Sequence, residues 1–155
     1  MSERQQATQD ARPSGPSIRQ LVFGAPTGKP TAPGGGDPFL APLFETAIEH
    51  VWGGVWNRPG LDLKYRSLVV VSVLAATGHN EELKTHLRGA RNLGWTVDEL
   101  REALLQTAPY AGFSAANEAL QALSAIVTQG LGCDAGPQTG ERHGKTEWPR
   151  DENAR

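Results

Sequence analysis

Residues 68–76, "LVVVSVLAA", are apolar at nearly every position, and this run constrains the fold more than any other stretch of the chain. Such a run must be covered on most sides, either as a central helix or as a strand inside a sheet. The valines suit a strand over "SLVVVSVL". However, the pattern extends over residues 63–78, and Asp62 precedes it as a helix N-cap would. Length and cap therefore predict a central helix, with the strand as the alternative.

Helical periodicity also marks the segments on both sides of this run. Residues 38–56 carry apolar side chains at helical spacing, and Pro38 suits the first turn of that helix. On the other side, Asn80 is expected to cap a helix that Gly94 ends. Both neighbours of the central helix are therefore expected to be helical.

Two more helices are predicted downstream. Thr96 and Glu99 have the spacing of a capping box at the start of one helix, which Pro109 and Gly112 are expected to end or kink. Ser114 is expected to start the other. The pattern thus predicts five helices and no convincing strand. Several faces are rich in alanine and thin for a self-contained core, which suggests helices shared between subunits.

The polar, turn-rich ends of the chain frame this helical part. Residues 1–36 are rich in Pro, Gly, Ser and Gln and are predicted to be a flexible arm, and residues 132–155 a flexible polar tail. The domain itself is expected at residues 37–131. One apolar piece of the arm, "IRQLVFG" at residues 18–24, is expected to dock onto the domain or onto a neighbouring subunit.

Composition excludes several classes of protein. The net charge is -2, and basic residues alternate with acidic ones, so neither nucleic acid nor an anionic membrane is an expected partner. Because no run of 18 apolar residues and no signal peptide is present, a cytoplasmic location is expected. The single cysteine, Cys133, cannot form an intrachain disulfide or a Cys-x-x-Cys pair, and we interpret it as a bystander thiol.

A histidine interrupts the apolar face of the helix expected at residues 80–93. His86 occupies a position on this face where leucine is the usual residue. One interpretation is a core histidine whose ring is hydrogen-bonded. The other is a functional group, because Glu82 lies one helical turn earlier and His79 one turn before that. Arg66 of the preceding helix faces the same hollow if the two helices pack as a hairpin.

These side chains suggest two kinds of site. A carboxylate, an imidazole and a guanidinium around an apolar hollow suit the binding of a small anion and the movement of a proton. His79, Glu82 and His86 also have the spacing H-x-x-E-x-x-x-H, but this is not the H-E-x-x-H zinc pattern, and no metal is expected.

Four motifs occur in order along the domain: "W-x-RPGLD", "RSL", "EEL-x-x-HLRGA" and "E-x-L-x-Q-x-A-x-YAG-x-x-AA". With them the chain resembles the carboxymuconolactone decarboxylase family, in particular its 4-carboxymuconolactone decarboxylases. The resemblance covers residues 38–125, and "IRQLVFG" resembles the N-terminal arm of the family.

The resemblance implies an all-α bundle of five to six helices, of the alkylhydroperoxidase D-like type, that assembles as a trimer or hexamer. It implies a small cyclic carboxylate or lactone as the substrate, without a cofactor and without a metal. The redox branch of that superfamily carries Cys-x-x-Cys before its histidine, and these cysteine positions are His79 and Glu82 here. The thiol chemistry of that branch is therefore excluded.

The implied reaction assigns roles to the candidate residues. Loss of CO2 from a carboxylated lactone leaves a dienolate that must be protonated on carbon. His86 is the candidate proton donor, and Glu82 orients it or shares the proton. Arg66 is the candidate for stabilising charge on the lactone or on the remaining carboxylate. Four further residues are candidates for substrate binding: His79, Trp52, His50 and Arg58.

Departures from the family pattern keep other functions open. Gly54 stands where the family usually has a glutamate, and Glu49 and His50 replace a basic and an aromatic residue. One alternative is acid–base chemistry, such as isomerisation, ring opening or dehydration, on another cyclic carbonyl compound. A non-catalytic helical oligomer and a metalloenzyme are the remaining alternatives.

Overall fold

The structure is a computed structural model that describes residues 13–24 and 36–131. Cys133 and the predicted tail lie outside the described residues. Within the described ranges the chain is all helical and has no strand, and it forms six helices when each π-helical segment is counted with the helix that it continues. The predicted all-α class and helix number are therefore confirmed, and the strand alternative for residues 67–74 is wrong.

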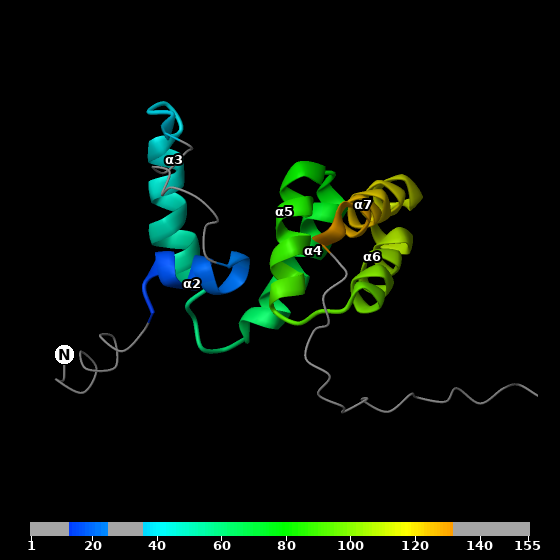
Figure 1. Ribbon diagram of the computed structural model, residues 1–155, viewed down its shortest axis with the longest axis horizontal. Helices are drawn as coiled ribbons and strands as arrows, with labels where there is room; N and C mark the ends of the chain where they lie inside the picture. The colour runs from blue at the N-terminus through cyan, green and yellow to red at the C-terminus, as the bar shows by residue number, and fades with distance from the viewer. Residues whose placement is uncertain (1–12, 25–35, 132–155) are drawn as a thin grey trace, which may run out of the picture.

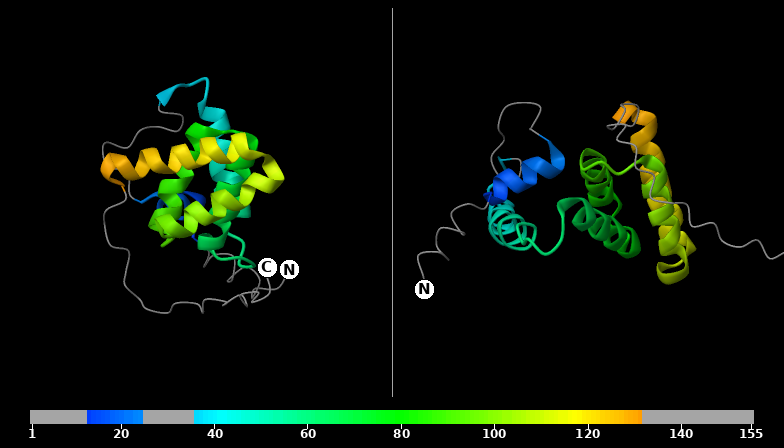
Figure 2. Two further views of the ribbon diagram at one scale, coloured as in Figure 1. Left: turned by 90° about the vertical axis from the view of Figure 1, so that its right-hand side faces the viewer. Right: turned by 90° about the horizontal axis from the view of Figure 1, so that it is seen from below.

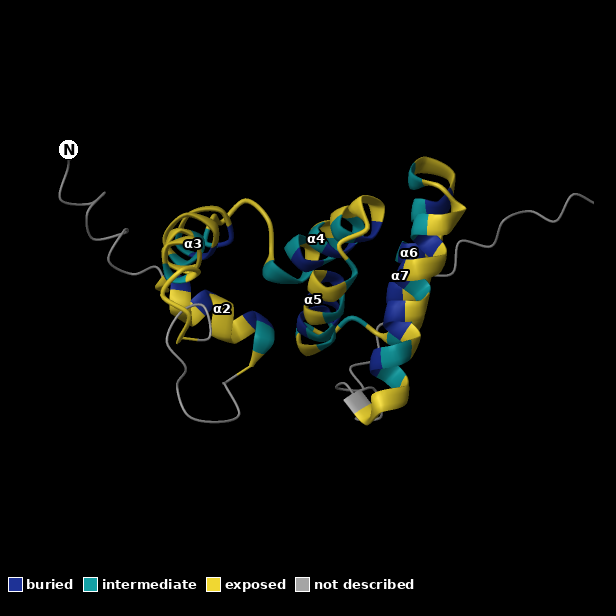
Figure 3. Cartoon of the chain, turned by 90° about the horizontal axis from the view of Figure 1, so that it is seen from above, coloured by how far each residue is buried: buried dark blue, intermediate teal, exposed yellow. Residues whose placement is uncertain are grey.

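The elements form three layers, each built from neighbouring helices (Figure 1, Figure 3). The first layer contains α2, α3 and η2, the middle layer α4 and α5, and the last layer α6 and α7. The middle layer contacts both others, through α2 on one side and through α6 and α7 on the other (Figure 2). In chain order the elements are α2 (Gly15–Phe23), α3 (Ala41–Thr46), π-helical η2 (Ala47–Val55), α4 (Leu63–Thr77), α5 (Asn80–Asn92), α6 (Val97–Ala111), α7 (Phe113–Ile126) and π-helical η3 (Val127–Leu131).

Two of the predicted helix signals are confirmed in atomic detail. The backbone N–H of Glu99 donates to Thr96 Oγ1 at 3.1 Å, and the backbone N–H of Thr96 donates to Glu99 Oε2 at 2.7 Å, which completes the capping box at the start of α6. Gly94, just beyond α5, has a φ of +90°, a conformation that glycine adopts without strain.

Other helix ends differ from the prediction. His79, not Asn80, occupies the N-cap position of α5, and the Asn80 amide instead donates to Glu118 Oε2 of α7 at 2.7 Å. Asp62 stands at the N-cap of α4, but its side chain makes no capping hydrogen bond. Asn80 and Asp62 therefore lie at the expected helix ends, but neither side chain caps its helix.

The prolines and the start of α7 also differ. Pro38 precedes α3, whose first turn contains Pro42. Helix α6 continues through Pro109 and ends at Ala111, so only Gly112 ends it, and α7 begins at Phe113 rather than at Ser114. Gly112 has a φ of +97°, which allows the sharp change of direction between α6 and α7.

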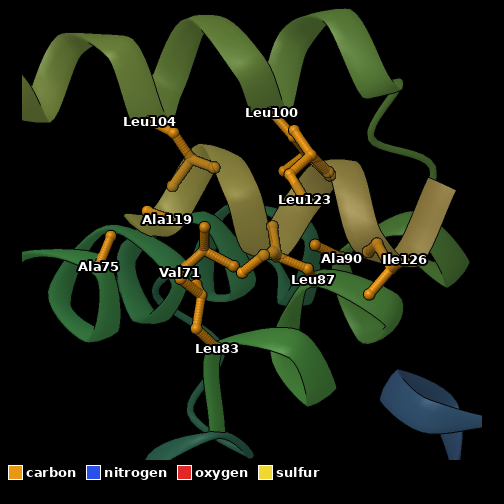
Figure 4. Packing of buried hydrophobic residues seen from close by; sticks show 11 residues of the cluster. Val71, Ala75, Leu83, Leu87, Ala90, Leu100, Leu104, Ala119, Leu123 and Ile126 are labelled. Carbon is orange, nitrogen blue, oxygen red and sulfur yellow. The ribbon is translucent and has the colours of Figure 1, made fainter. Parts of the chain in front are cut away.

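The main core lies between the middle and last layers. In Figure 4 the labelled side chains of four helices point toward one another across this space. Its buried residues come only from α4 to α7: Val71, Ala75, Leu83, Leu87, Ala90, Leu100, Leu104, Ala119, Ala122, Leu123 and Ile126. This core therefore forms without any residue from the first layer.

Helix α4 is central, but one of its faces is open. Val71 and Ala75 are buried in the main core, whereas Tyr65, Val69 and Val73 are 52%, 55% and 55% exposed. These three residues are spaced four apart and share one helix face. The expectation that α4 is covered on most sides is thus not met within a single chain. Among the described residues, no helix is long and apolar enough to cross a membrane.

A second core joins the first layer to the middle layer. Ile18 and Val22 of α2 are buried against Trp52 of η2 and Trp56 just beyond it. The expected docking of "IRQLVFG" onto the domain therefore occurs through α2. The predicted boundaries of the arm and the domain remain predictions.

Two glycines allow α2 to approach its neighbours closely. A Cβ at Gly15 would lie 2.9 Å from the backbone nitrogen of Gly53, and closer still to the carbonyl oxygen of Ile48 in η2. A Cβ at Gly89 of α5 would lie 2.9 Å from side-chain atoms of Phe23 and Val22. Because both Cβ atoms are absent, α2 can pack closely against η2 and α5.

We expect Gly15→Ala to loosen α2 selectively. The new Cβ meets backbone atoms that cannot rotate away, so the free energy that holds α2 in place should fall by about 1–3 kcal/mol. Native-state amide exchange at Val22 reports this change, while amides of α6 and α7 should keep their protection. Gly60→Ala is the matched control, because a Cβ there meets nothing within 4 Å. Unchanged exchange at Val22 would show that the close approach is not required.

Candidate active site

His86 lies inside the second core, where aromatic rings surround it. The residue is 7% exposed. Its ring centroid lies 5.2 Å from that of Phe23 in an edge-on arrangement. The rings of Trp52 and Trp56 lie 6.4 and 6.3 Å away, the first almost parallel at 4°. The imidazole is therefore enclosed by apolar surface from α2 and from η2 and its end.

Glu82 is the polar neighbour of this imidazole. His86 Nε2 lies 3.7 Å from Glu82 Oε1, one helical turn earlier on α5. His86 Nδ1 is buried and has no hydrogen-bond partner among the described residues. Glu82 is largely exposed and connects the buried ring to the surface. The pair that the sequence predicted is thus brought together.

Burial and the carboxylate act on His86 in opposite directions. Desolvation by the surrounding rings lowers the pKa of His86, because the charged imidazolium loses its hydration. The negative charge of the nearby Glu82 carboxylate raises this pKa, but by less. The pKa of His86 therefore lies below its ordinary value of 6.5, and the ring is mainly neutral at neutral pH.

A cavity of about 470 Å³ opens beside His86. This volume lies in the range of roughly 300–1,000 Å³ that is typical of small-molecule sites. Aromatic and aliphatic side chains of α2, α3 and η2 form its apolar wall, and α5 contributes most of its polar groups. The lining residues are Arg19, Phe23, Phe44, Ala47, Ile48, Trp52, Glu81, Glu82, Thr85 and His86.

Arg66 does not line this cavity. Its Nε donates to the carbonyl oxygen of Leu61 at 2.9 Å, and its Nη2 donates to that of Arg58 at 2.8 Å. The guanidinium therefore fixes the turn between η2 and α4. The structure does not bring Arg66 to His86 as expected, because the carbonyl groups of the turn engage its guanidinium instead.

Of the other predicted binding residues, one lines the cavity and three do not. Trp52 lines the cavity, as expected for a substrate-binding residue. His79 is exposed and its Nδ1 lies 2.7 Å from Thr77 Oγ1, while His50 is exposed beside Glu49. Arg58 lines a smaller hollow of about 200 Å³. The structure therefore does not bring His79, His50 or Arg58 to His86.

The altered positions near Trp52 also lie away from the cavity lining. Glu49 and Gly54 are exposed on η2. A Cβ at Gly54 would meet only the carbonyl oxygen of Glu49, at an ordinary contact distance of 3.9 Å. Packing within the chain therefore does not require glycine at this position.

No metal-ligand cluster is formed in the part of the chain that the structure describes. There, no three or more His, Cys, Asp and Glu side chains lie close enough together to hold one ion. His79, Glu82 and His86 share a sequence pattern, but His79 lies before the start of α5 and contacts Thr77, the last residue of α4.

Sequence reasoning missed Arg19, Phe23 and Phe44. Arg19 and Phe23 are spaced four apart in "SIRQLVF", which places them on one helix face. That spacing shows that they neighbour each other, but it does not show where α2 docks. Phe44 is one of many apolar residues in its segment, and no local signal distinguishes it.

The sequence matches a known family and curated relatives. Residues 41–125 match the Carboxymuconolactone decarboxylase family. A 4-carboxymuconolactone decarboxylase of Acinetobacter baylyi is 51% identical over 69 residues, which are 44% of this chain and 52% of the relative. A nitrosuccinic acid decarboxylase of Metarhizium robertsii is 45% identical over 92 residues, which are 59% of this chain and 61% of the relative. The matches thus span between half and two thirds of these relatives.

The pKa of His86 provides a direct test of the site. We expect NMR titration of His86 to give a pKa below 6.5, and Glu82→Gln to lower it further by removing the carboxylate that stabilises the imidazolium. Glu81→Gln, on the neighbouring residue, is the matched control and should change this pKa less.

The same shift makes stability depend on pH. The unfolded chain takes up a proton at His86 before the folded chain does, so the free energy of unfolding should fall as the pH falls below 6.5 and through the folded pKa. His86→Leu should remove this part of the pH dependence. A His86 pKa at or above 6.5 would contradict the described burial.

Proposed function

The chain belongs to the carboxymuconolactone decarboxylase family, and we propose that it is a decarboxylase whose reaction takes place in the cavity beside His86. The observation that carries the proposal is the His86–Glu82 pair, which places a proton-transfer group opposite the aromatic wall of the cavity. The two relatives are named as decarboxylases, which supports the same reaction class.

The acids that give the two relatives their names can lose CO2 by the same chemistry. In 4-carboxymuconolactone and in nitrosuccinic acid, the departing carboxylate leaves its electron pair to an acceptor, a conjugated lactone carbonyl or a nitro group. The C–C bond breaks, neutral CO2 departs, and the resulting dienolate or nitronate takes a proton on carbon. Each molecule also keeps a second carboxylate. The cavity therefore needs a proton donor and a wall that favours CO2 over a carboxylate.

We assign the proton transfer to His86. The imidazolium donates its proton to the carbon of the dienolate or nitronate, and the neutral ring is then reprotonated from solvent by way of Glu82. The protonated fraction of His86 falls as the pH rises through its pKa. Because this pKa is lowered, the fall occurs below pH 6.5. Glu82, 3.7 Å from Nε2, maintains a part of this fraction by stabilising the imidazolium.

The apolar wall contributes to bond cleavage. Phe23, Phe44 and Trp52 offer no hydrogen bond from their ring faces to a carboxylate. A departing carboxylate placed against them is destabilised relative to neutral CO2. This wall favours cleavage without a cofactor, which the family resemblance also implies.

A carboxylated lactone is the first candidate substrate, and a nitro-substituted diacid is the second. The lactone rests on the family resemblance and on the Acinetobacter relative. The nitro acid rests on the Metarhizium relative, whose match covers more of this chain. Both fit a cavity of about 470 Å³.

The first experiment measures CO2 release from freshly prepared 4-carboxymuconolactone and from nitrosuccinate without added cofactor. His86→Gln should lower kcat by about 10²–10⁴-fold, the usual contribution of a general acid. Glu82→Gln should shift the decline of kcat/KM with rising pH to lower pH. Glu102→Gln, an exposed carboxylate of α6, is the matched control and should have no effect.

Two results would contradict the proposal. Full activity in His86→Gln would exclude His86 as the donor. No CO2 from the folded wild-type protein with either acid would instead favour acid–base chemistry on another cyclic carbonyl compound, or a non-catalytic role.

We also propose that the chain assembles as a homo-oligomer, a trimer or hexamer. The support is the exposed apolar face of α4, formed by Tyr65, Val69 and Val73. Leu43 and Val55 of the first layer are also more than half exposed. A single chain thus leaves apolar surface on two layers.

Light scattering tests the assembly. The wild-type mass should be three or six times that of the chain, and Val69→Lys should lower it, because a charge is costly in an apolar contact. Circular dichroism should show unchanged helix content in the variant, since Val69 is 55% exposed within the chain. A monomeric wild-type protein would exclude the assembly.

A further inference from the structure

We propose that Arg19 binds the carboxylate that the substrate keeps, so that the cavity takes dicarboxylic acids and holds them in one orientation. This inference rests on the proposed function, because it names the substrate class of the same site. Arg19 was not among the residues that the sequence singled out, and Arg66 was expected in its place.

Arg19 and His86 border the same cavity from opposite helices. Arg19 projects from α2 and His86 from α5, and both line the cavity. Arg19 Cζ lies 5.3 Å from the centroid of the Phe23 ring, and the His86 ring lies 5.2 Å from the same centroid. One phenyl ring therefore contacts both groups. A small molecule in the cavity therefore meets both a guanidinium and an imidazole.

The guanidinium of Arg19 is available to a ligand. Within residues 13–24 and 36–131, Arg19 forms no ion pair and no side-chain hydrogen bond; its one recorded interaction is with the face of Phe23. Two other cations of the domain are engaged: Lys84 lies 2.6 Å from Glu81, and Arg66 donates to two turn carbonyls. Apart from His86, Arg19 is also the one basic side chain among the cavity-lining residues.

The backbone beneath Arg19 is held firmly although the side chain is exposed. The adjacent residue Ile18 is 4% exposed, and Val22 is fully buried. Asn92 of α5 also donates to the carbonyl oxygen of Val22 at 3.3 Å. With the close approaches at Gly15 and Gly89, these contacts fix the direction from which Arg19 enters the cavity.

The charges of the cavity are separated, and this separation orients a dicarboxylate. The cation is on α2, whereas Glu81 and Glu82 are on α5 beside His86. A carboxylate is attracted to Arg19 and repelled from the α5 side. The retained carboxylate therefore occupies the Arg19 end, and the departing one lies nearer His86 and Glu82. This placement explains how only one of two carboxylates is lost.

A binding experiment tests Arg19 without requiring turnover. The probes for calorimetry are succinate, a dicarboxylate that cannot decarboxylate by this route, and succinamide, its neutral analogue of similar shape. Wild-type protein should bind succinate more tightly. Arg19→Gln should weaken succinate binding about 10- to 100-fold, as expected for loss of a charge-assisted contact, and leave succinamide binding nearly unchanged.

Three further variants make the test specific. Arg19→Lys should restore a part of the succinate preference, since it keeps the charge but loses the bidentate geometry. Arg101→Gln, an exposed guanidinium of α6 paired with Asp98, should bind succinate like the wild type. Arg66→Gln should keep the succinate preference. In turnover, Arg19→Gln should raise KM more than it lowers kcat, unlike His86→Gln.

The outcomes separate this inference from the proposed decarboxylation. Succinate binding that depends on Arg19, without CO2 release from either acid, would overturn the decarboxylation and support the dicarboxylate site. Loss of the succinate preference in Arg66→Gln but not in Arg19→Gln would overturn the role of Arg19. Equal effects of Arg19→Gln on both probes, or no binding of either probe, would overturn it as well.

Discussion

The site depends on the close packing of α2 between η2 and α5. Gly15 and Gly89 lack the Cβ atoms that would hold these helices apart. Their contact places Phe23 edge-on to His86, buries Val22, and brings Arg19 to the cavity. Without this packing, α5 would present a solvated histidine beside a glutamate. With it, the same two residues border a cavity that has aromatic side chains on its opposite wall.

Enclosure and charge act on the pKa of His86 in opposite directions, and enclosure has the larger effect. Three aromatic rings remove water from the imidazole and lower its pKa, whereas the nearby Glu82 carboxylate limits that decrease. A fully desolvated histidine without Glu82 would hold a proton only in stronger acid. A solvated one would lack the apolar surroundings that destabilise a departing carboxylate. Burial among the rings fits the core interpretation drawn from the sequence, and the proposed proton transfer adds a function to that core residue.

Local sequence signals predicted the features that depend on neighbouring residues. The capping box at Thr96 and the glycine end of α5 require only contacts within a few residues, and the His86–Glu82 pair requires only one helical turn. Arg66 was misplaced because its partners are the carbonyls of a turn, whose path no periodicity reveals.

Interactions between distant segments were the part that sequence patterns could not predict. Asn80 was expected to be a cap, but it contacts Glu118 of α7, 38 residues away. Arg19 was missed because its place at the cavity depends on where α2 docks, and this docking is allowed by glycines in α2 and α5. The open face of α4 was likewise concealed, because an apolar run does not reveal whether its cover belongs to the same chain.

The residues that keep the domain folded are almost entirely separate from those that line the cavity. The main core uses side chains of α4 to α7, whereas most of the cavity wall comes from the first layer. Changes in the nine residues of α2 thus alter the charge and shape presented to a ligand at little cost to the principal core. Such a division would let substitutions in α2 change the ligand preference of the cavity while the main core keeps its packing.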